Sequence, residues 1–108
     1  MECIFCKVVA RVVPAKVVHE DQSLLVFHDV SPIAKTHLLI IPKKHCKNMK
    51  DVDCLEGFPG QMFATVKLLA AKLSDSQSFK LICNNESAAG QVVFHLHWHF
   101  VSNDQLTD

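Results

Sequence analysis

The alternation of hydrophobic and polar positions predicts several short strands near the start of the chain. Residues 16–21 (KVVHED) and 24–30 (LLVFHDV) are rich in β-branched and apolar side chains around a turn-like DQS, so they predict a hairpin. Residues 37–42 (HLLIIP) predict a buried strand, which ends at Pro42 because proline has no N–H to donate to a neighbouring strand. The preceding residues 3–11 (CIFCKVVAR) fit either a short helix or a metal-binding knuckle.

The middle of the chain predicts one long helix. Apolar side chains recur there at spacings of four, three and four, at Met62, Val66, Leu69 and Leu73. This period places them on one face of an amphipathic helix over residues 60–75, whose start is marked by Pro59 and Gly60. Residues 79–83 (FKLIC) predict a further strand, and residues 84–90 (NNESAAG) predict a loop.

The last predicted strand, residues 92–101 (VVFHLHWHFV), carries three of the seven histidines of the chain. Because side chains alternate between faces along a strand, His95, His97 and His99 share one face at a repeat of about 6.5–7 Å. The intervening positions are large and apolar: Leu96, Trp98 and Phe100. We therefore expect the histidines to lie on one side of the sheet and the apolar residues to face the core.

The composition is that of one globular domain. A chain of 108 residues, 49% hydrophobic and 20% charged, can form one core, so we expect a single domain over residues 1–108. Strands in hairpins at both ends and one long helix between them predict an α+β fold with a mainly antiparallel sheet. The 11 basic and 11 acidic residues balance, which argues against nucleic acid or a membrane as a partner, because both favour a basic surface.

We expect a cytoplasmic protein, present in the nucleus as well if its source is eukaryotic. Residues 1–14 contain Glu2 and no continuous apolar segment, so no secretory signal is expected, and the longest apolar runs, such as 38–41, are too short to cross a bilayer. Five cysteines, an odd number without a disulfide-framework spacing, indicate free or metal-bound thiols in a reducing compartment.

The histidine face has two possible chemical functions. The alternative, that the three histidines share a face by chance, is less favoured. Neighbouring histidines on a strand can share one zinc ion. Alternatively, one imidazole acts as a nucleophile while its neighbours fix its tautomer and hold the group that it attacks. The chain has no G-x-x-x-x-G-K-[ST] loop, so phosphate chemistry would depend on imidazoles and backbone N–H groups.

The Cys3-x-x-Cys6 pair has a spacing that fits a zinc ligand pair, although a buried pair without metal has the same spacing. A redox pair of the thioredoxin type would follow a strand, and only two residues precede Cys3. His45 and one histidine of the 92–101 segment are the candidates to complete a Cys2His2 site.

The motif HLHWHFV, residues 95–101, resembles the His-φ-His-φ-His-φ-φ signature of the histidine triad (HIT) superfamily. The stretch CIFCKVVARVVPAKVVHEDQSLLVFHDVSPIAKTHLLIIPKKH is similar, nearly residue for residue, to histidine triad nucleotide-binding proteins of the purine nucleoside phosphoramidase branch. The similarity covers about residues 3–101 and is weakest over 46–60. It implies a five-stranded antiparallel sheet with one long and one short helix, and a homodimer with a continuous ten-stranded sheet.

The resemblance also implies a reaction, the hydrolysis of nucleoside 5′-phosphoramidates or related conjugates of AMP or GMP at the α-phosphorus. His97 takes the position of the nucleophile, His99 that of a phosphate contact, and His37 that of a histidine beside them. The implied nucleotide-binding positions also include Phe5, Val8, Phe27, His28, Asp29 (for the ribose hydroxyls), Val30, Asn84, Gly90, Gln91 and Val93. A structural zinc ion is implied at Cys3, Cys6, His45 and His95, and no organic cofactor is implied.

Two positions depart from the family pattern. Val92 stands where phosphoramidase relatives often have a serine, and Trp98 replaces a usual aliphatic residue. The residues NDQLTD also end the chain without the longer tail of some relatives. Three alternatives therefore stay open: a dinucleoside polyphosphate hydrolase, a nucleotide-binding regulatory protein without catalysis, and a catalytic zinc centre on the histidine face.

Overall fold

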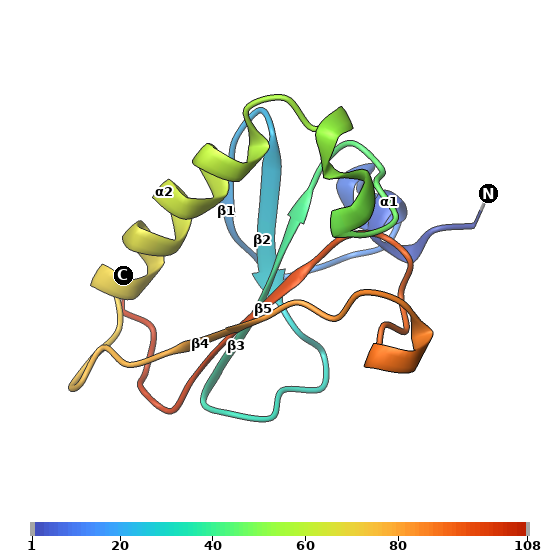
Figure 1. Cartoon of the computed structure of the whole chain (residues 1–108). Coiled ribbons are helices and arrows are strands. Elements are labelled where there is room, and N and C mark those ends of the chain that lie inside the picture. The colour runs from blue at the N-terminus through green and yellow to red at the C-terminus, as the bar shows by residue number, and fades with distance from the viewer. Residues whose placement is uncertain (1, 108) are drawn as a thin grey trace.

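The structure, a computed structural model that describes residues 2–107, is built on a five-stranded antiparallel sheet with the strand order β1-β2-β3-β5-β4 (Figure 1). The strands are β1 (Val17–Glu20), β2 (Leu24–His28), β3 (Thr36–Pro42), β4 (Lys80–Ile82) and β5 (Trp98–Ser102). Two α-helices, α1 (Ile4–Val9) and α2 (Phe58–Ala71), and two 3-10 turns, η1 (Met49–Cys54) and η2 (Ser87–Ala89), complete the fold. The predicted α+β class, the five antiparallel strands and the one long and one short helix are confirmed.

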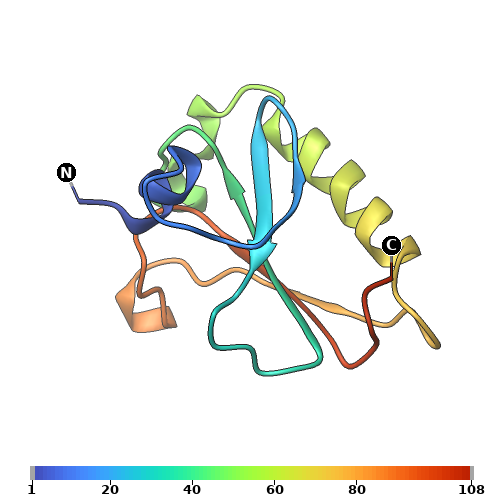
Figure 2. The same ribbon diagram turned by 180° about the vertical axis from the view of Figure 1, so that it is seen from behind.

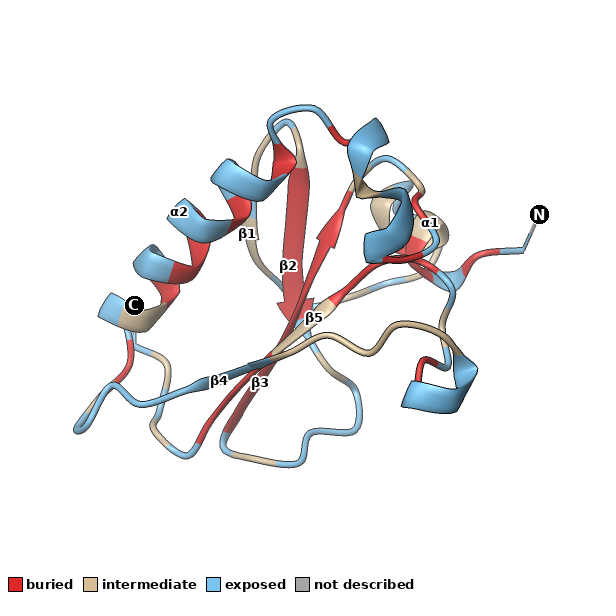
Figure 3. Ribbon diagram, in the orientation of Figure 1, coloured by how far each residue is buried: buried red, intermediate tan, exposed pale blue. Residues whose placement is uncertain are grey.

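The two faces of the sheet are buried by different helices (Figures 1 and 2). On one face, Leu24, Val26, Leu38 and Ile40 pack against the buried side of α2, which contributes Met62, Val66 and Leu69. On the other face, Leu25, Phe27, Leu39 and Ile41 pack against Phe5 and Val8 of α1. Alternate residues of β2 and β3 therefore enter opposite cores, and both strands are almost wholly buried (Figure 3).

Helix α2 begins earlier and ends earlier than the predicted span of 60–75. It starts at Phe58 after Gly57, whose positive φ of 76° reverses the chain, with Pro59 in the first turn, and its last residue is Ala71. The apolar stripe is nevertheless the predicted one, since Met62, Val66 and Leu69 are buried on it. None of the helices among residues 2–107 combines the length and the hydrophobicity needed to cross a bilayer.

The last strand is shorter than predicted. The interpretation of residues 92–101 as one strand is wrong, because β5 begins only at Trp98 and residues 91–97 have no regular structure. The backbone polar groups of this segment bond outside the sheet: Leu96 donates its N–H to the Cys46 carbonyl at 2.6 Å, and the His95 carbonyl accepts from the His97 ring at 2.8 Å. His95 and His97 therefore precede the sheet, and His99 lies within it.

The predicted division of this segment into a polar and an apolar side is confirmed. Leu96 and Phe100 are buried in the core beneath α2, and Trp98 packs at its border with its ring 5.8 Å from that of Phe58. His99 lies opposite Leu39 of β3, so it projects from the other face, the one covered by α1. Trp98 thus has a partner at the first residue of α2.

Candidate functional site

The predicted metal ligands Cys3, Cys6, His45 and His95 come together from three separate segments of the chain. Cys3 precedes α1 and caps it, since its sulfur accepts the Cys6 N–H at 3.3 Å. The ligand atoms of all four residues lie within 4.8 Å of one another. The cluster joins the N-terminal segment to the loop after β3 and to the histidine segment before β5.

The tautomer of His95 leaves its Nδ1 lone pair facing the two thiols. His95 Nε2 lies 2.8 Å from the carbonyl oxygen of Pro42, which can only accept, so Nε2 carries the proton. The lone pair on Nδ1 then points to the sulfurs of Cys3, at 3.3 Å, and Cys6, at 3.5 Å. Burial lowers the pKa of His95, which favours the neutral ring that a metal requires.

The spacing of these donors fits a zinc ion. Tetrahedral zinc, with bonds of about 2.3 Å to sulfur and 2.0–2.1 Å to nitrogen, separates sulfur and nitrogen ligands by about 3.5 Å. The sulfur–nitrogen distances in the cluster are 3.3, 3.4 and 3.5 Å, including that from Cys6 to His45 Nδ1. Burial and the adjacent Cys3 thiol raise the pKa of Cys6 to about 11, so a bound cation would be needed to stabilise its thiolate.

A second cluster of possible ligands, Asp29, His37 and His99, has the wrong tautomers for a metal site. The Ile33 N–H donates to His37 Nδ1 at 3.2 Å, so the proton of neutral His37 is on Nε2. This Nε2–H faces Asp29 Oδ2 at 3.4 Å and donates to His99 Nδ1 at 2.9 Å. Every nitrogen that faces the centre is thus already engaged in a hydrogen-bonded relay.

The relay determines the tautomer of His99. Because its Nδ1 accepts from His37, neutral His99 carries its proton on Nε2, where it can donate to a ligand. Burial, followed by the repulsion of His97 and His37, lowers the pKa of His99, which keeps this ring neutral. The His99 ring lies 5.1 Å from the ring of His97.

His97 is held in the opposite tautomer. Its Nδ1 lies 2.8 Å from the His95 carbonyl oxygen and must donate to it, so the lone pair of the neutral ring is on Nε2. The ring is buried and packs edge-on against Phe5 at 5.2 Å. His97 thus presents an oriented basic nitrogen beside a ring, His99, that presents an N–H.

An apolar hollow of about 390 Å³ is connected to these histidines by Phe5, which lines the hollow and packs edge-on against the His97 ring. It lies between α1 and β2, and seven of the predicted nucleotide-binding residues line it: Phe5, Val8, Phe27, His28, Asp29, Val30 and Val93. The rings of Phe5 and Phe27 meet edge-to-face at 5.7 Å. Asp29, on the rim of this hollow, also faces the His37–His99 relay.

The remaining predicted nucleotide-binding residues, Asn84, Gly90 and Gln91, belong to the loop of residues 84–93, called here the phosphate loop. Gly90 has a φ of 96°, and the Asn84 side chain lies 3.8 Å from where a β-carbon would stand. Gln91 is buried, and its amide nitrogen donates to the Lys47 and Val93 carbonyls. Within residues 2–107, the amide N–H groups of Val92 and Val93 make no hydrogen bond.

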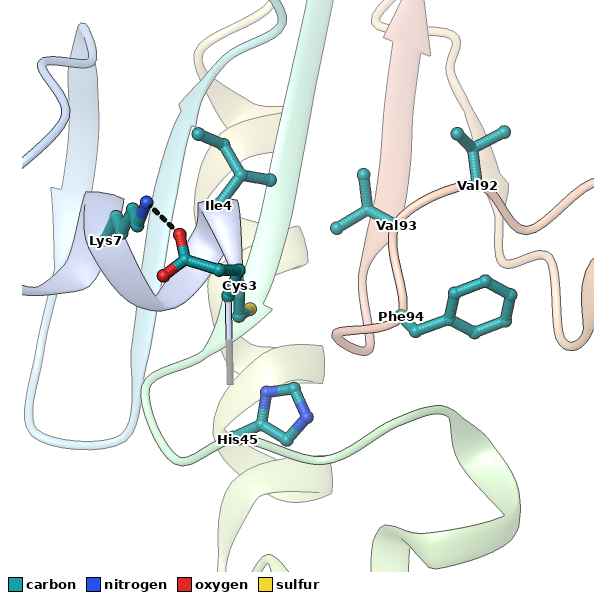
Figure 4. A pocket seen from close by; sticks show the side chains of 8 residues that line it. Cys3, Ile4, Lys7, His45, Val92, Val93 and Phe94 are labelled. Atoms are coloured by element: carbon teal, nitrogen blue, oxygen red, sulfur yellow. Dashed lines mark hydrogen bonds and ion pairs between the residues drawn. The ribbon is translucent and has the colours of Figure 1, made fainter.

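A second hollow, of about 400 Å³, lies between the start of α1 and residues 92–94 (Figure 4). Cys3 and His45 border it, so it adjoins the metal-type cluster. Val92 is 83% exposed on its edge, where many relatives are expected to carry a hydroxyl.

Two polar residues of the site were not predicted from the sequence, Asn48 and Glu86. Asn48 is fully buried and donates to Glu86 and to Gln91, at 3.0 and 3.1 Å. Glu86 lies within the phosphate loop and has a φ of 78°. An isolated asparagine and an isolated loop glutamate give no periodic or motif signal, so nothing in the sequence distinguishes them from surface residues.

The chain belongs to the HIT domain family, whose model matches residues 10–106. It is 39% identical over 101 residues to the protein HitA of Neisseria gonorrhoeae, covering 92% of this chain and 94% of that protein. The predicted superfamily is therefore confirmed.

Solved structures share the whole fold. A HIT family hydrolase from Legionella pneumophila is 39% identical, superposes with a TM-score of 0.86, and is matched over 98% of this chain and 96% of its own. A zinc-bound histidine triad family protein from Mycobacterium smegmatis is 28% identical with a TM-score of 0.79, matched over 100% of this chain and 85% of its own.

Proposed function

We propose that this protein hydrolyses nucleoside 5′-phosphoramidates or related nucleotidyl conjugates at the α-phosphorus, with His97 as the nucleophile. The observation that carries the proposal is the hydrogen bond between His97 Nδ1 and the His95 carbonyl, at 2.8 Å. That bond fixes the neutral ring with its lone pair on Nε2, the form in which imidazole attacks phosphorus. The similarity to a HIT family hydrolase supports a hydrolytic reaction.

In the proposed first step, His97 Nε2 forms a bond to the α-phosphorus while the phosphorus–nitrogen bond of the substrate breaks. The amine leaves with a proton taken from solvent, because an amide anion is a very poor leaving group, and general-acid delivery of such a proton contributes about 10²–10⁴-fold. In the second step, water attacks the phosphorus of the nucleotidyl-histidine and the bond from phosphorus to His97 Nε2 breaks. The nucleoside monophosphate leaves, one proton of the water passes to solvent, and the neutral His97 ring is restored with its lone pair on Nε2.

The phosphoryl oxygens would be held by fixed donors. His99 offers its Nε2–H because His37 occupies its Nδ1. The N–H groups of Val92 and Val93 are free of other partners among residues 2–107 and lie in the phosphate loop. Donors that are already oriented stabilise the developing charge without reorganisation. Val92 supplies no hydroxyl, which removes a contact worth about 0.5–1.5 kcal/mol.

The hollow between α1 and β2 fits a nucleoside, and we propose a purine there. Its lining combines the rings of Phe5 and Phe27 with aliphatic side chains, a surface suited to a flat base. The Asp29 carboxylate on its rim can accept from ribose hydroxyls. Phe5 connects the proposed base site to the proposed phosphate site, because it lines the hollow and its ring packs against the His97 ring.

We propose that Cys3, Cys6, His45 and His95 hold a structural zinc ion. When bound, the ion would fasten the N-terminal segment and α1 to the rest of the domain. All four donors would be taken by protein ligands, the arrangement typical of structural zinc.

We also propose a homodimer and a cytoplasmic location. β4 is an edge strand, so a second copy can pair with it and extend the sheet to ten strands. Phe79 and Leu81 near this edge, and Phe63 and Leu68 on the outer side of α2, are exposed apolar residues. Leu81→Glu should therefore shift the mass in solution from dimer to monomer, measured by light scattering.

The test of the reaction is to trap the covalent intermediate. Wild-type protein mixed with adenosine 5′-phosphoramidate, quenched within the first turnover and digested, should yield a peptide containing His97 that is heavier by one adenylyl group. Guanosine 5′-phosphoramidate should give the corresponding guanylyl adduct. The proposal would be contradicted if wild-type protein hydrolysed either compound without forming an adduct on His97, or if the His97→Ala variant kept full activity.

A further inference from the structure

Glu86, in the phosphate loop, has a backbone conformation that residues other than glycine rarely adopt. Its φ of 78° and ψ of 157° fall in a region that is accessible almost only to glycine, because a β-carbon collides there with the adjacent backbone. Such a conformation persists only where the surroundings impose it. The contacts of Glu86 must therefore offset the free-energy cost of its backbone conformation.

The Glu86 carboxylate is held by three donors from residues 47–50. It accepts from Asn48 Nδ2 at 3.0 Å and from Lys50 Nζ at 2.7 Å, and Lys47 Nζ lies at 3.4 Å. The bonds from Lys50 and Asn48 lower the pKa of Glu86 to about 2, so the carboxylate is ionised at any physiological pH. A glycine at this position would relieve the backbone but would have no side chain to bind these donors.

Residues 47–50 also hold Gln91, at the other end of the turn that begins at Glu86. The Glu86 N–H donates to Gln91 Oε1 at 2.8 Å, and Asn48 Nδ2 donates to that oxygen at 3.1 Å. Gln91 Nε2 in turn donates to the Lys47 carbonyl at 2.7 Å. The turn between Glu86 and Gln91 is thus closed upon itself and fastened to residues 47–50, directly before the two free amides of Val92 and Val93.

We propose that Glu86 is a positioning residue: its carboxylate anchors the phosphate loop to residues 47–50 and so fixes the Val92 and Val93 amides that hold the phosphoryl group. This inference rests on the proposed function. Glu86 itself does not touch the reacting atoms, because its carboxylate is directed to the lysines and to Asn48. Its contribution should therefore appear in the rate of the chemical step and not in the binding of the nucleoside.

Glu86→Gly is the most informative variant, because it relieves the backbone and removes the anchor at once. We expect its melting temperature to equal or exceed that of the wild type, while kcat for adenosine 5′-phosphoramidate falls about 10-fold and KM changes little. Hydrogen exchange of the amides of residues 87–93 should become faster. A residue that merely tolerates its conformation would give a more stable protein with unchanged kcat.

Glu86→Gln and Lys50→Gln provide an independent measure of the anchor, because each removes one charge without relieving the backbone. Both should lower kcat in the same direction as Glu86→Gly, by smaller factors. Glu56→Gln, a change at an exposed glutamate away from the loop, is the matched control and should leave kcat and the exchange of residues 87–93 unchanged.

Failure of the inference is distinct from failure of the proposed function. If wild-type protein does not turn over phosphoramidates, the proposed function fails, and hydrogen exchange of residues 87–93 still tests the anchor. If wild-type protein is active and Glu86→Gly retains its kcat and the slow exchange of the loop, Glu86 does not position the loop.

Discussion

Two clusters of titratable side chains lie close together in this domain, and hydrogen bonds prepare them for different tasks. In the Cys3–Cys6–His45–His95 cluster, the Pro42 carbonyl accepts a hydrogen bond from the His95 Nε2–H, which leaves the Nδ1 lone pair facing two thiols. In the Asp29–His37–His99 cluster, the Ile33 N–H occupies His37 Nδ1, so that a proton faces the centre. The residue types alone do not distinguish a metal site from a proton relay, but the backbone groups around them do.

In the sequence, His97 stands between His95 of the first cluster and His99 of the second, and replacing it should give the largest effect on the comparison. His97→Gln should lower turnover of adenosine 5′-phosphoramidate by at least about 10³-fold, because the nucleophile is lost. Its zinc content should equal that of the wild type, because His97 is not a ligand. Steady-state kinetics and elemental analysis on the same samples provide the measurement. A fall in zinc content parallel to the fall in activity would mean that the two clusters are not separate.

Removal of the metal should affect stability first. With free zinc at a thousandfold excess over its dissociation constant, loss of the site should lower the free energy of unfolding by about 4 kcal/mol. Chelation and His45→Ala should each produce this loss in urea denaturation. Cys54→Ser is the control, because Cys54 is a free, exposed thiol outside the cluster. Equal stability with and without zinc would contradict a structural role.

The relay should respond to changes at His37 without a change in zinc content. His37→Ala removes the donor to His99 Nδ1, so that the His99 Nε2–H is no longer fixed, and should lower kcat by about 10²-fold, the lower end of the loss expected for one oxyanion donor. His37→Gln keeps an N–H in the side chain and should recover part of this loss. Equal rates for the Ala and Gln variants would show that the hydrogen bond to His99 does not matter.

The smallest expected effect is on the pH dependence of stability. The folded pKa of His99 is lower than the unfolded value of 6.5, so protonation favours the unfolded chain. The free energy of unfolding should therefore fall as the pH decreases below 6.5. His99→Asn should reduce this slope relative to the wild type, measured by urea denaturation at several pH values with zinc held constant. An unchanged slope would assign the loss of stability to other histidines.

The sequence predicts the sheet and α2 well because their signals are local and repeated. The 16–21 and 24–30 segments form β1 and β2, and the helical period places Met62, Val66 and Leu69 on the buried side. The predicted start of β5 is six residues too early, since the 92–97 segment has strand-like alternation but its polar groups bind elsewhere, as Leu96 N–H does to Cys46. Tertiary hydrogen bonds outweighed a pattern that is only local.

The candidate site is predictable from the sequence where a residue type has only a few chemical roles. Cysteine and histidine at the predicted positions do assemble into one cluster, and the predicted nucleoside residues do line one hollow. The side-chain contacts and backbone conformation of the phosphate loop could not be predicted from the sequence. The side chain of Gln91 is used internally, and a glutamate gives no indication that it will adopt the backbone of a glycine. Such features depend on contacts with residues 47–50, which are distant in the sequence.

The acceptor that orients His97 is the backbone carbonyl of His95, whereas the lone pair that faces the thiols is on the side chain of the same residue. Every amino acid has a carbonyl, so mutation at position 95 cannot delete the acceptor that selects the tautomer of His97. The ligand and the acceptor are therefore separable in evolution. A descendant of this chain can exchange His95 for another residue, lose the proposed zinc site, and still inherit the orientation of the His97 ring.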